Sequence, residues 1–116
     1  MKFSITKEFT FSASHILLGL AAGHQCGRLH GHNYTVTLEL TGPLNEDGMV
    51  MDYGDLSDFD EWVKDTLDHR HLNDGMVSNP TAENLAHYIM SNAPLDDLVV
   101  AVTVCETPKT TARCEL

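Results

Sequence analysis

The sequence is poor in cysteine and has no long hydrophobic run. Its 116 residues include three cysteines, Cys26, Cys105 and Cys114. An odd, sparse set is not the disulfide framework of a small secreted protein, so we expect free thiols, with a Cys105–Cys114 bridge as the alternative. No segment approaches the roughly 20 apolar residues of a membrane helix, and the first residues alternate as in a strand rather than a signal peptide. We therefore expect a cytoplasmic protein that does not associate with membranes.

Basic residues are also scarce, since seven Lys and Arg face 17 Asp and Glu, for a formal net charge of −10. This balance argues against nucleic acid or anionic lipid as a partner. The basic residues that lie within seven positions of a residue singled out below include Arg28, Arg70, Lys109 and Arg113. One interpretation is that so few basic residues are grouped by chance. The functional interpretation is a local positive pocket for an anionic substrate.

The hydrophobic pattern indicates one α+β domain spanning residues 1–116. Strands are predicted over residues 2–12, with a phase slip and a β-bulge near Lys7, and over 32–41, where apolar and polar residues alternate. A short return strand is predicted over 49–53, and a last strand over 98–106 with Val100, Val102, Val104 and Glu106 in phase. Two helices are predicted, one over 55–67 and one that begins near Asn79-Pro80-Thr81, where capping residues and proline coincide.

This order of elements predicts an antiparallel four-stranded sheet with two helices on one face. Such a sheet leaves edge strands unpaired, and proteins generally cover or pair these edges. Association of several copies into a closed ring would remove the edges. We therefore expect an oligomer.

A histidine-rich segment carries the strongest chemical signal, Cys26-x-x-x-His30-Gly31-His32, with His15 upstream. Residues i and i+2 of a strand point to the same face, so His30 and His32 can reach one metal ion, with His15 as a third ligand. Three imidazoles that leave one position open are typical of catalytic Zn²⁺. Cys26 is then a reactive thiol rather than a ligand. The alternative for His15 is a histidine hydrogen-bonded within the fold.

Two further groups carry potential chemistry. Asp68 precedes His69 at the end of the first predicted helix, where an aspartate can orient a histidine as a general acid or base, although histidine also simply suits a helix C-terminus. His71 cannot be separated from His69 on physical grounds. Glu106 ends the last strand in phase with valines. It is either a strand-end carboxylate in solvent or a buried acceptor for a planar heterocycle rich in N–H groups.

Taken together, Cys26-x-x-x-His30-Gly31-His32, Asp68-His69 and Glu106 resemble the 6-pyruvoyltetrahydropterin synthase family, in the same order and from Phe9 to Glu106. The three-residue spacer after Cys26 is similar to the bacterial queuosine-pathway branch. The resemblance implies a tunnelling fold in which trimers close a barrel and two trimers form a homohexamer. It also implies active sites between subunits.

The resemblance implies that Zn²⁺ is held by His15, His30 and His32, that Cys26 is the base, that Asp68-His69 is its partner pair and that Glu106 anchors the pterin. The implied reaction converts 7,8-dihydroneopterin triphosphate to 6-carboxy-5,6,7,8-tetrahydropterin, with release of acetaldehyde and triphosphate. The alternatives are 6-pyruvoyltetrahydropterin synthesis, a related pterin side-chain lyase, or non-catalytic binding of zinc or pterin.

Overall fold

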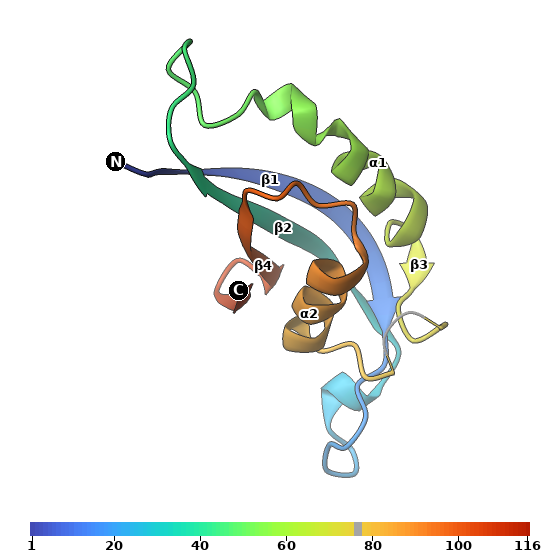
Figure 1. Cartoon of the computed structure of the whole chain (residues 1–116). Coiled ribbons are helices and arrows are strands. Elements are labelled where there is room, and N and C mark those ends of the chain that lie inside the picture. Colours follow the sequence, from blue (N-terminus) through green and yellow to red (C-terminus); the bar gives the residue numbers. More distant parts are fainter. Residues whose placement is uncertain (76–77) are drawn as a thin grey trace.

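The computed structural model describes residues 1–75 and 78–116. Its centre is a curved five-stranded sheet in the order β3-β1-β2-β4-β5, with both helices packed on one face (Figure 1). The strands are β1 (Phe3–His15), β2 (His30–Gly42), β3 (Arg70–His71), β4 (Val99–Thr107) and β5 (Thr110–Glu115). The helices are α1 (Ser57–Thr66) and α2 (Ala82–Asn92), and short 3-10 turns span Gln25–Gly27 and Tyr53–Leu56. Among the described residues, no helix is long and apolar enough to cross a membrane.

The α+β class and the two helices agree with the sequence prediction, but the four-stranded antiparallel sheet was wrong. The sheet is mixed, because β3 runs parallel to β1, with Ser14 paired to His71. The predicted return strand over 49–53 does not form. Asp52 instead accepts a hydrogen bond from the Gly54 N–H and starts a 3-10 turn. The strand β5 was missed, although Pro108 and Lys109 form a two-residue turn before it.

The predicted bulge near Lys7 was also wrong. Pairing of β1 with β2 is continuous from Phe3 opposite Gly42 to His15 opposite His30. Lys7 occupies the same face as the flanking aromatic residues, and its ammonium lies 5.5 Å from the centroid of the Phe9 ring. A lysine can take such a position because its long stem packs on apolar surface while its charge reaches a ring face.

A register shift occurs instead where β2 meets β4. Glu39 pairs with Ala101, and Leu40 pairs with Val99, so that two residues of β4 advance against one of β2. Val99 and Val102 are therefore buried, whereas Val100 is only half-buried. The prediction that Val100 shares a face with the later valines was wrong for this reason.

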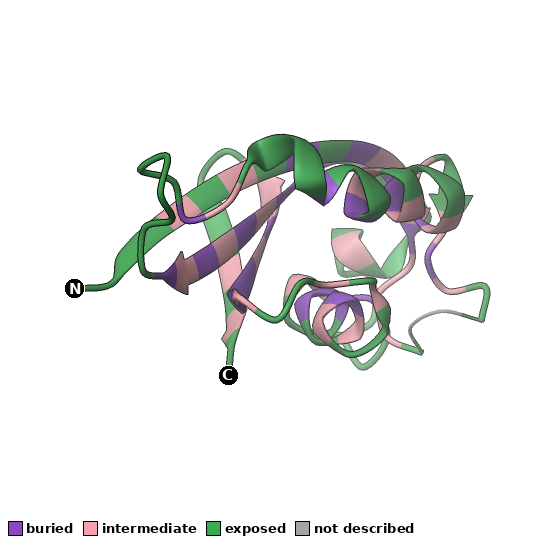
Figure 2. Cartoon of the chain, turned by 45° about the horizontal axis from the view of Figure 1, so that its top comes forward, coloured by how far each residue is buried: buried purple, intermediate pink, exposed green. Residues whose placement is uncertain are grey.

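The core fills the space between the sheet and the helices (Figure 2). The buried row of β2 follows the predicted alternation, and α1 and α2 each contribute one apolar side, so that the core includes Tyr34, Val36, Leu38, Leu40, Phe59, Val63, Leu85, Ala86 and Ile89. Burying each large side chain stabilises the fold by about 1.5–3 kcal/mol. Thr81 caps α2 by accepting a hydrogen bond from the Asn84 N–H at 3.1 Å, as its capping role predicted. This cap fixes the preceding residue, Pro80, beside the end of β1.

Candidate active site

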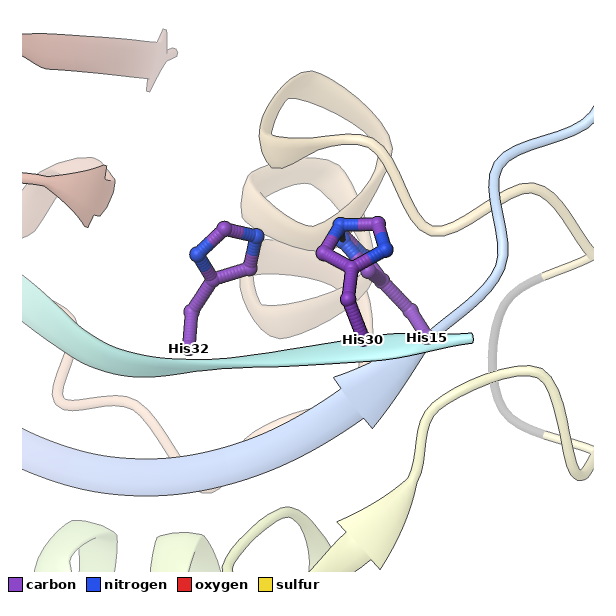
Figure 3. Close-up of side chains that lie close together, drawn as sticks. All are labelled: His15, His30 and His32. Carbon is purple, nitrogen blue, oxygen red and sulfur yellow. Dashed lines mark hydrogen bonds between the residues drawn. The ribbon is translucent and has the colours of Figure 1, made fainter. Parts of the chain in front are cut away.

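Three histidines converge at the end of the β1–β2 pair. His15 is the last residue of β1 and lies directly opposite His30, the first residue of β2, while His32 lies opposite Ala13. The three rings rise from the same face of the two strands (Figure 3). One nitrogen from each lies within 4.8 Å of the others. The strands extend further into the predicted loop than the sequence indicated, and this extension is what brings the three imidazoles together.

Backbone carbonyls fix the orientation of two of these rings. The Nδ1 of His15 lies 2.8 Å from the Pro80 carbonyl oxygen, and the Nδ1 of His30 lies 2.7 Å from the Arg28 carbonyl oxygen. A carbonyl can only accept, so each Nδ1 carries the proton and each neutral ring presents a bare Nε2. Those two Nε2 atoms face each other at 2.9 Å. Two facing lone pairs repel unless a proton or a cation lies between them, and a metal ion satisfies both.

Electrostatics favour the neutral form that a metal requires. Burial lowers the pKa of His15, and the positive charges of His30, His32 and His71 lower it further, against a rise from the Pro80 carbonyl. A histidine binds a metal ion through its unprotonated nitrogen. Nδ1 bonds to backbone carbonyls are the usual outer support of such ligands. The donor set therefore fits a divalent cation of the type that imidazole prefers.

Tyr34 packs beneath the cluster, continuing the row of His30 and His32 along β2. Its hydroxyl oxygen lies 3.2 Å from the Nδ1 of His15. Burial raises the pKa of Tyr34, and the negative charge of Glu106 raises it further. Tyr34 therefore stays a neutral phenol that supports the His15 ring and is not a source of protons.

Cys26 sits in the 3-10 turn of the loop that joins β1 to β2, and it is half-buried. Its N–H donates to the Nδ1 of His24 at 3.1 Å, and its carbonyl accepts from the Leu17 N–H at 3.1 Å. Within residues 1–75 and 78–116, the group that can hold a metal consists of the three histidines without Cys26. This placement leaves the thiol free for chemistry. Cys26, Cys105 and Cys114 are all free thiols.

Glu106 borders a cavity of about 440 Å³ whose lining includes Leu17, Glu83 and Arg113. Burial raises the pKa of Glu106, repulsion from Glu83 raises it further, and attraction from His32 and His30 opposes the rise. The carboxylate is thus half-buried and lies close enough to the histidines for their charges to affect it. Leu17 links this cavity to the Cys26 backbone. The structure therefore gathers His15, His30, His32 and Glu106 on one side of the sheet, with the Cys26 loop beside them.

Asp68 and His69 lie elsewhere, on the far edge of β1. The Asp68 carboxylate accepts a hydrogen bond from the Ser12 N–H at 2.9 Å and lies 3.0 Å from the Nδ1 of His69. The Ser12 N–H and His69 together lower the pKa of Asp68 against its desolvation. His69 adopts a left-handed φ of 59°, its N–H donates to the Ser12 carbonyl, and its side chain is 83% exposed. The pair is formed as predicted, but it lies outside the three-histidine group of its own chain.

The other histidines and the basic residues considered from the sequence do not gather at one site. His24 and His87 are exposed, and His24 also caps the turn that holds Cys26. The four basic residues do not form one pocket. Arg113 borders the Glu106 cavity but pairs with Glu39 and Glu115, and Arg70 borders a different cavity. The carbonyl partners of His15 and His30 could not be predicted from the sequence, because backbone contacts leave no side-chain signature.

The fold and the site together define an α+β protein with three histidines placed so that they could hold a metal ion. The family model described as 6-pyruvoyl tetrahydropterin synthase matches residues 4–116. The chain belongs to this family of pterin synthases. It is 39% identical over 122 residues to the 6-carboxy-5,6,7,8-tetrahydropterin synthase of Synechocystis, covering 94% of this chain and 90% of that protein.

Two animal proteins are also similar. The 6-pyruvoyl tetrahydrobiopterin synthase of Drosophila melanogaster is 35% identical over 125 residues, covering 90% of this chain and 74% of that protein. The solved structure of Caenorhabditis elegans 6-pyruvoyl tetrahydropterin synthase superposes with a TM-score of 0.83 at 28% identity, covering 99% of this chain and 96% of that one. The similarity thus extends over almost the whole chain.

Proposed function

We propose that this chain is a zinc-dependent 6-carboxy-5,6,7,8-tetrahydropterin synthase of queuosine biosynthesis. Its substrates would be 7,8-dihydroneopterin triphosphate and one water molecule, and its products the 6-carboxy pterin, acetaldehyde and triphosphate. The observation that carries the choice is the similarity over nearly the full length to a bacterial relative that bears this name. The three-residue spacer between Cys26 and His30 supports the same branch.

His15, His30 and His32 would hold the metal through their Nε2 atoms, with Nδ1 of His15 and of His30 fixed by backbone carbonyls. Zn²⁺ bound there would act as a Lewis acid on the oxygens of the substrate side chain and make its carbon-bound protons easier to remove. Three protein ligands leave a position for the substrate, as in catalytic zinc sites. The arrangement supports catalysis better than a purely structural role.

Cys26 would act as the base that moves a proton of the substrate side chain. The thiolate is the reactive form of cysteine, and a nearby cation favours it. The half-buried position of Cys26 in a loop that contacts the Glu106 cavity through Leu17 supports this role. Glu106 would accept hydrogen bonds from ring N–H groups of the pterin, which a half-buried carboxylate does well.

His69, oriented by Asp68, would exchange a proton on the other side of the substrate. Because the pair lies on the far edge of β1, it would act on a substrate held by a second copy of the chain. In the described part of the chain, β3 pairs with β1 only at Ala13 and Ser14, and β5 ends the other side of the sheet. The rest of the outer edge of β1 and the edge of β5 support an assembly in which copies join edge to edge. We propose a closed ring of three copies, and a homohexamer formed from two such rings, with the pterin triphosphate as the only small-molecule partner.

The test is product identification. The zinc-loaded protein is incubated with 7,8-dihydroneopterin triphosphate, and the products are assigned by mass, with acetaldehyde measured separately and a chelated sample as control. The proposal predicts equal amounts of acetaldehyde and 6-carboxy product, both lost on chelation. The animal relatives favour a second candidate, 6-pyruvoyltetrahydropterin synthesis, which would give a pyruvoyl product without acetaldehyde and would reject the queuosine assignment.

A further inference from the structure

A second cavity, of about 490 Å³, lies on the face of the β1–β2 pair that points away from the helices. Its walls come from β1, β2 and the segment that includes β3. The polar lining consists of two hydroxyls, one amide, three imidazoles and one guanidinium: Ser12, Ser14, Asn33, His32, His69, Arg70 and His71. The lining contains no carboxylate. This is unusual in a chain with 17 acidic and seven basic residues.

The cavity presents hydrogen-bond donors that the fold leaves available. The Ser12 hydroxyl donates to Oδ1 of Asn33 at 2.7 Å, which turns the amide NH₂ of Asn33 toward other partners. Nδ1 of His71 is engaged by the Ser14 hydroxyl at 2.9 Å, so its Nε2 remains for a ligand. Nδ1 of His69 is likewise engaged by Asp68. These contacts orient the polar groups without using all of their capacity.

Arg70 supplies the positive charge. One of its Nη atoms donates to the Asp65 backbone carbonyl at 3.0 Å, which holds the guanidinium in place while its other N–H groups remain. Within the described part of the chain, Arg70 has no carboxylate within salt-bridge distance, whereas Lys64 and Arg113 each do. Among acidic groups in this region, Asp68 is already bonded to the Ser12 N–H, and Asp65 and Asp74 line an adjoining cavity that Arg70 and His71 also border.

The floor of the cavity is kept open by Gly31, between the two histidines of β2. A Cβ at this position would lie 3.1 Å from the Ala13 carbonyl oxygen and would project from the face that borders the cavity. Gly31 therefore affects both faces of the β1–β2 pair. It allows the strands to pair closely where the histidines converge, and it leaves space behind them.

We infer that this cavity binds the phosphate groups of the pterin triphosphate, with Arg70, His71 and Asn33 as the residues that contact them. Planar guanidinium and N–H donors are the groups that recognise phosphate, and a cavity free of carboxylates does not repel it. The cavity is lined mainly by residues on the face of these strands opposite to the histidine cluster, and His32 is the cluster residue that also borders it. The phosphates bound here therefore belong to a substrate whose side chain is held by the histidines of a second copy. The inference rests on the proposed function for the identity of the anion.

The test uses inorganic tripolyphosphate as the probe and the zinc-loaded protein by calorimetric titration, with zinc content measured before and after because polyphosphates bind zinc. Arg70→Gln removes the cavity charge, and Lys64→Gln removes one charge from the exposed face of α1 as the matched control. We expect Arg70→Gln to weaken binding about tenfold or more, and Lys64→Gln to change it less than about twofold. Equal affinities of the two variants would overturn the inference.

A second variant tests whether weaker binding in Arg70→Gln comes from a change in the fold rather than from the lost contact. Asn33→Ala removes an exposed amide from the opposite wall and should also weaken the probe severalfold. With the pterin triphosphate itself, Arg70→Gln should raise KM while kcat changes little, since the lost contact is made before and during the reaction alike. An unchanged KM in an active enzyme would contradict the inference and leave the reaction assignment standing. A wild-type protein that makes no 6-carboxy product would instead reject the reaction, while the tripolyphosphate titration would still decide whether the cavity binds phosphate.

Discussion

The imidazole of His15 lies with its Nδ1 2.8 Å from the carbonyl oxygen of Pro80, the residue two positions before α2. The contact joins the end of β1 to the start of a helix 65 residues later in the chain. It fixes which nitrogen of His15 faces the other two histidines. This contact therefore connects the entry of α2 to the three-histidine group, and the backbone before the helix orients one histidine of that group.

Substitution of His15 should lower the affinity of the protein for the metal while the rest of the chain still folds. His15→Gln keeps a polar side chain of similar length but removes the imidazole. We expect the affinity for Zn²⁺ to fall on the order of 100-fold or more, beyond the 10–100-fold typical of losing only an outer partner. Competition with a chromophoric chelator measures this, with exposed His87→Gln as the control. Undiminished zinc affinity would remove His15 from the ligand set.

The position of Asp68-His69 on the far edge of β1 leads to a prediction about shared sites. Cys26→Ala and His69→Ala should each abolish turnover and retain zinc. Mixed by unfolding and reassembly, they should recover activity, because some sites then combine Cys26 of one copy with His69 of another. Random mixing gives about a quarter of the sites both residues. Activity that stays at the level of the separate variants would show that each chain uses its own pair.

Loss of zinc from the Cys26→Ala variant alone would lead to a different conclusion. It would show that Cys26 is a metal ligand rather than a base. Cys105→Ala is the matched control, since Cys105 is an equally half-buried free thiol outside the histidine cluster. We expect it to retain both zinc and turnover.

The side chain of Asn73 bonds to the backbone of Ile16, the residue that follows β1, as a neighbouring strand would. Its side-chain Oδ1 accepts from the Ile16 N–H at 2.9 Å, and its Nδ2 donates to the Ile16 carbonyl at 2.8 Å. Asn73→Ala would leave both partly buried backbone groups unpaired, so we expect a loss of about 1–3 kcal/mol in the free energy of unfolding. Urea unfolding measures it, with Asn92→Ala, which removes one exposed bond to the Tyr88 carbonyl, as the milder control. Equal losses in the two variants would show that the Ile16 contacts add nothing.

Local patterns predicted the parts of this molecule whose period is clear. The buried row of β2 and the stripes of both helices follow from spacing alone, and the histidine pair at i and i+2 followed from strand geometry. The β4 bulge shifted Val100 off its row, because register depends on the neighbouring strand rather than on the strand's own pattern. β3 was missed since two residues carry no periodicity. The separation of Asp68-His69 from the histidines is a matter of topology, which motif spacing does not encode.

Glu106 gives a prediction about pH in the metal-free protein. Its pKa is raised in the fold, chiefly by burial, so the folded state holds the proton more tightly than the unfolded chain, whose reference value is 4.5. The stabilising effect of that proton is therefore present below pH 4.5 and is lost as the pH rises through the folded-state pKa. At neutral pH the ionised carboxylate destabilises the fold. Glu106→Gln should then raise the Tm at pH 7 and leave it nearly unchanged at pH 4, while it abolishes pterin binding.

Thermal unfolding between pH 4 and 8 tests this, with Glu46→Gln in the exposed β2–α1 connection as the control for lost negative charge. Because the chain is strongly acidic, that control should itself stabilise slightly at every pH above the carboxyl range. The effect specific to Glu106 is the part of the Tm increase in Glu106→Gln that exceeds the increase in Glu46→Gln. A Glu106→Gln profile parallel to that of Glu46→Gln would mean that burial does not oppose ionisation of Glu106, and that its carboxylate is as freely solvated as one at the surface.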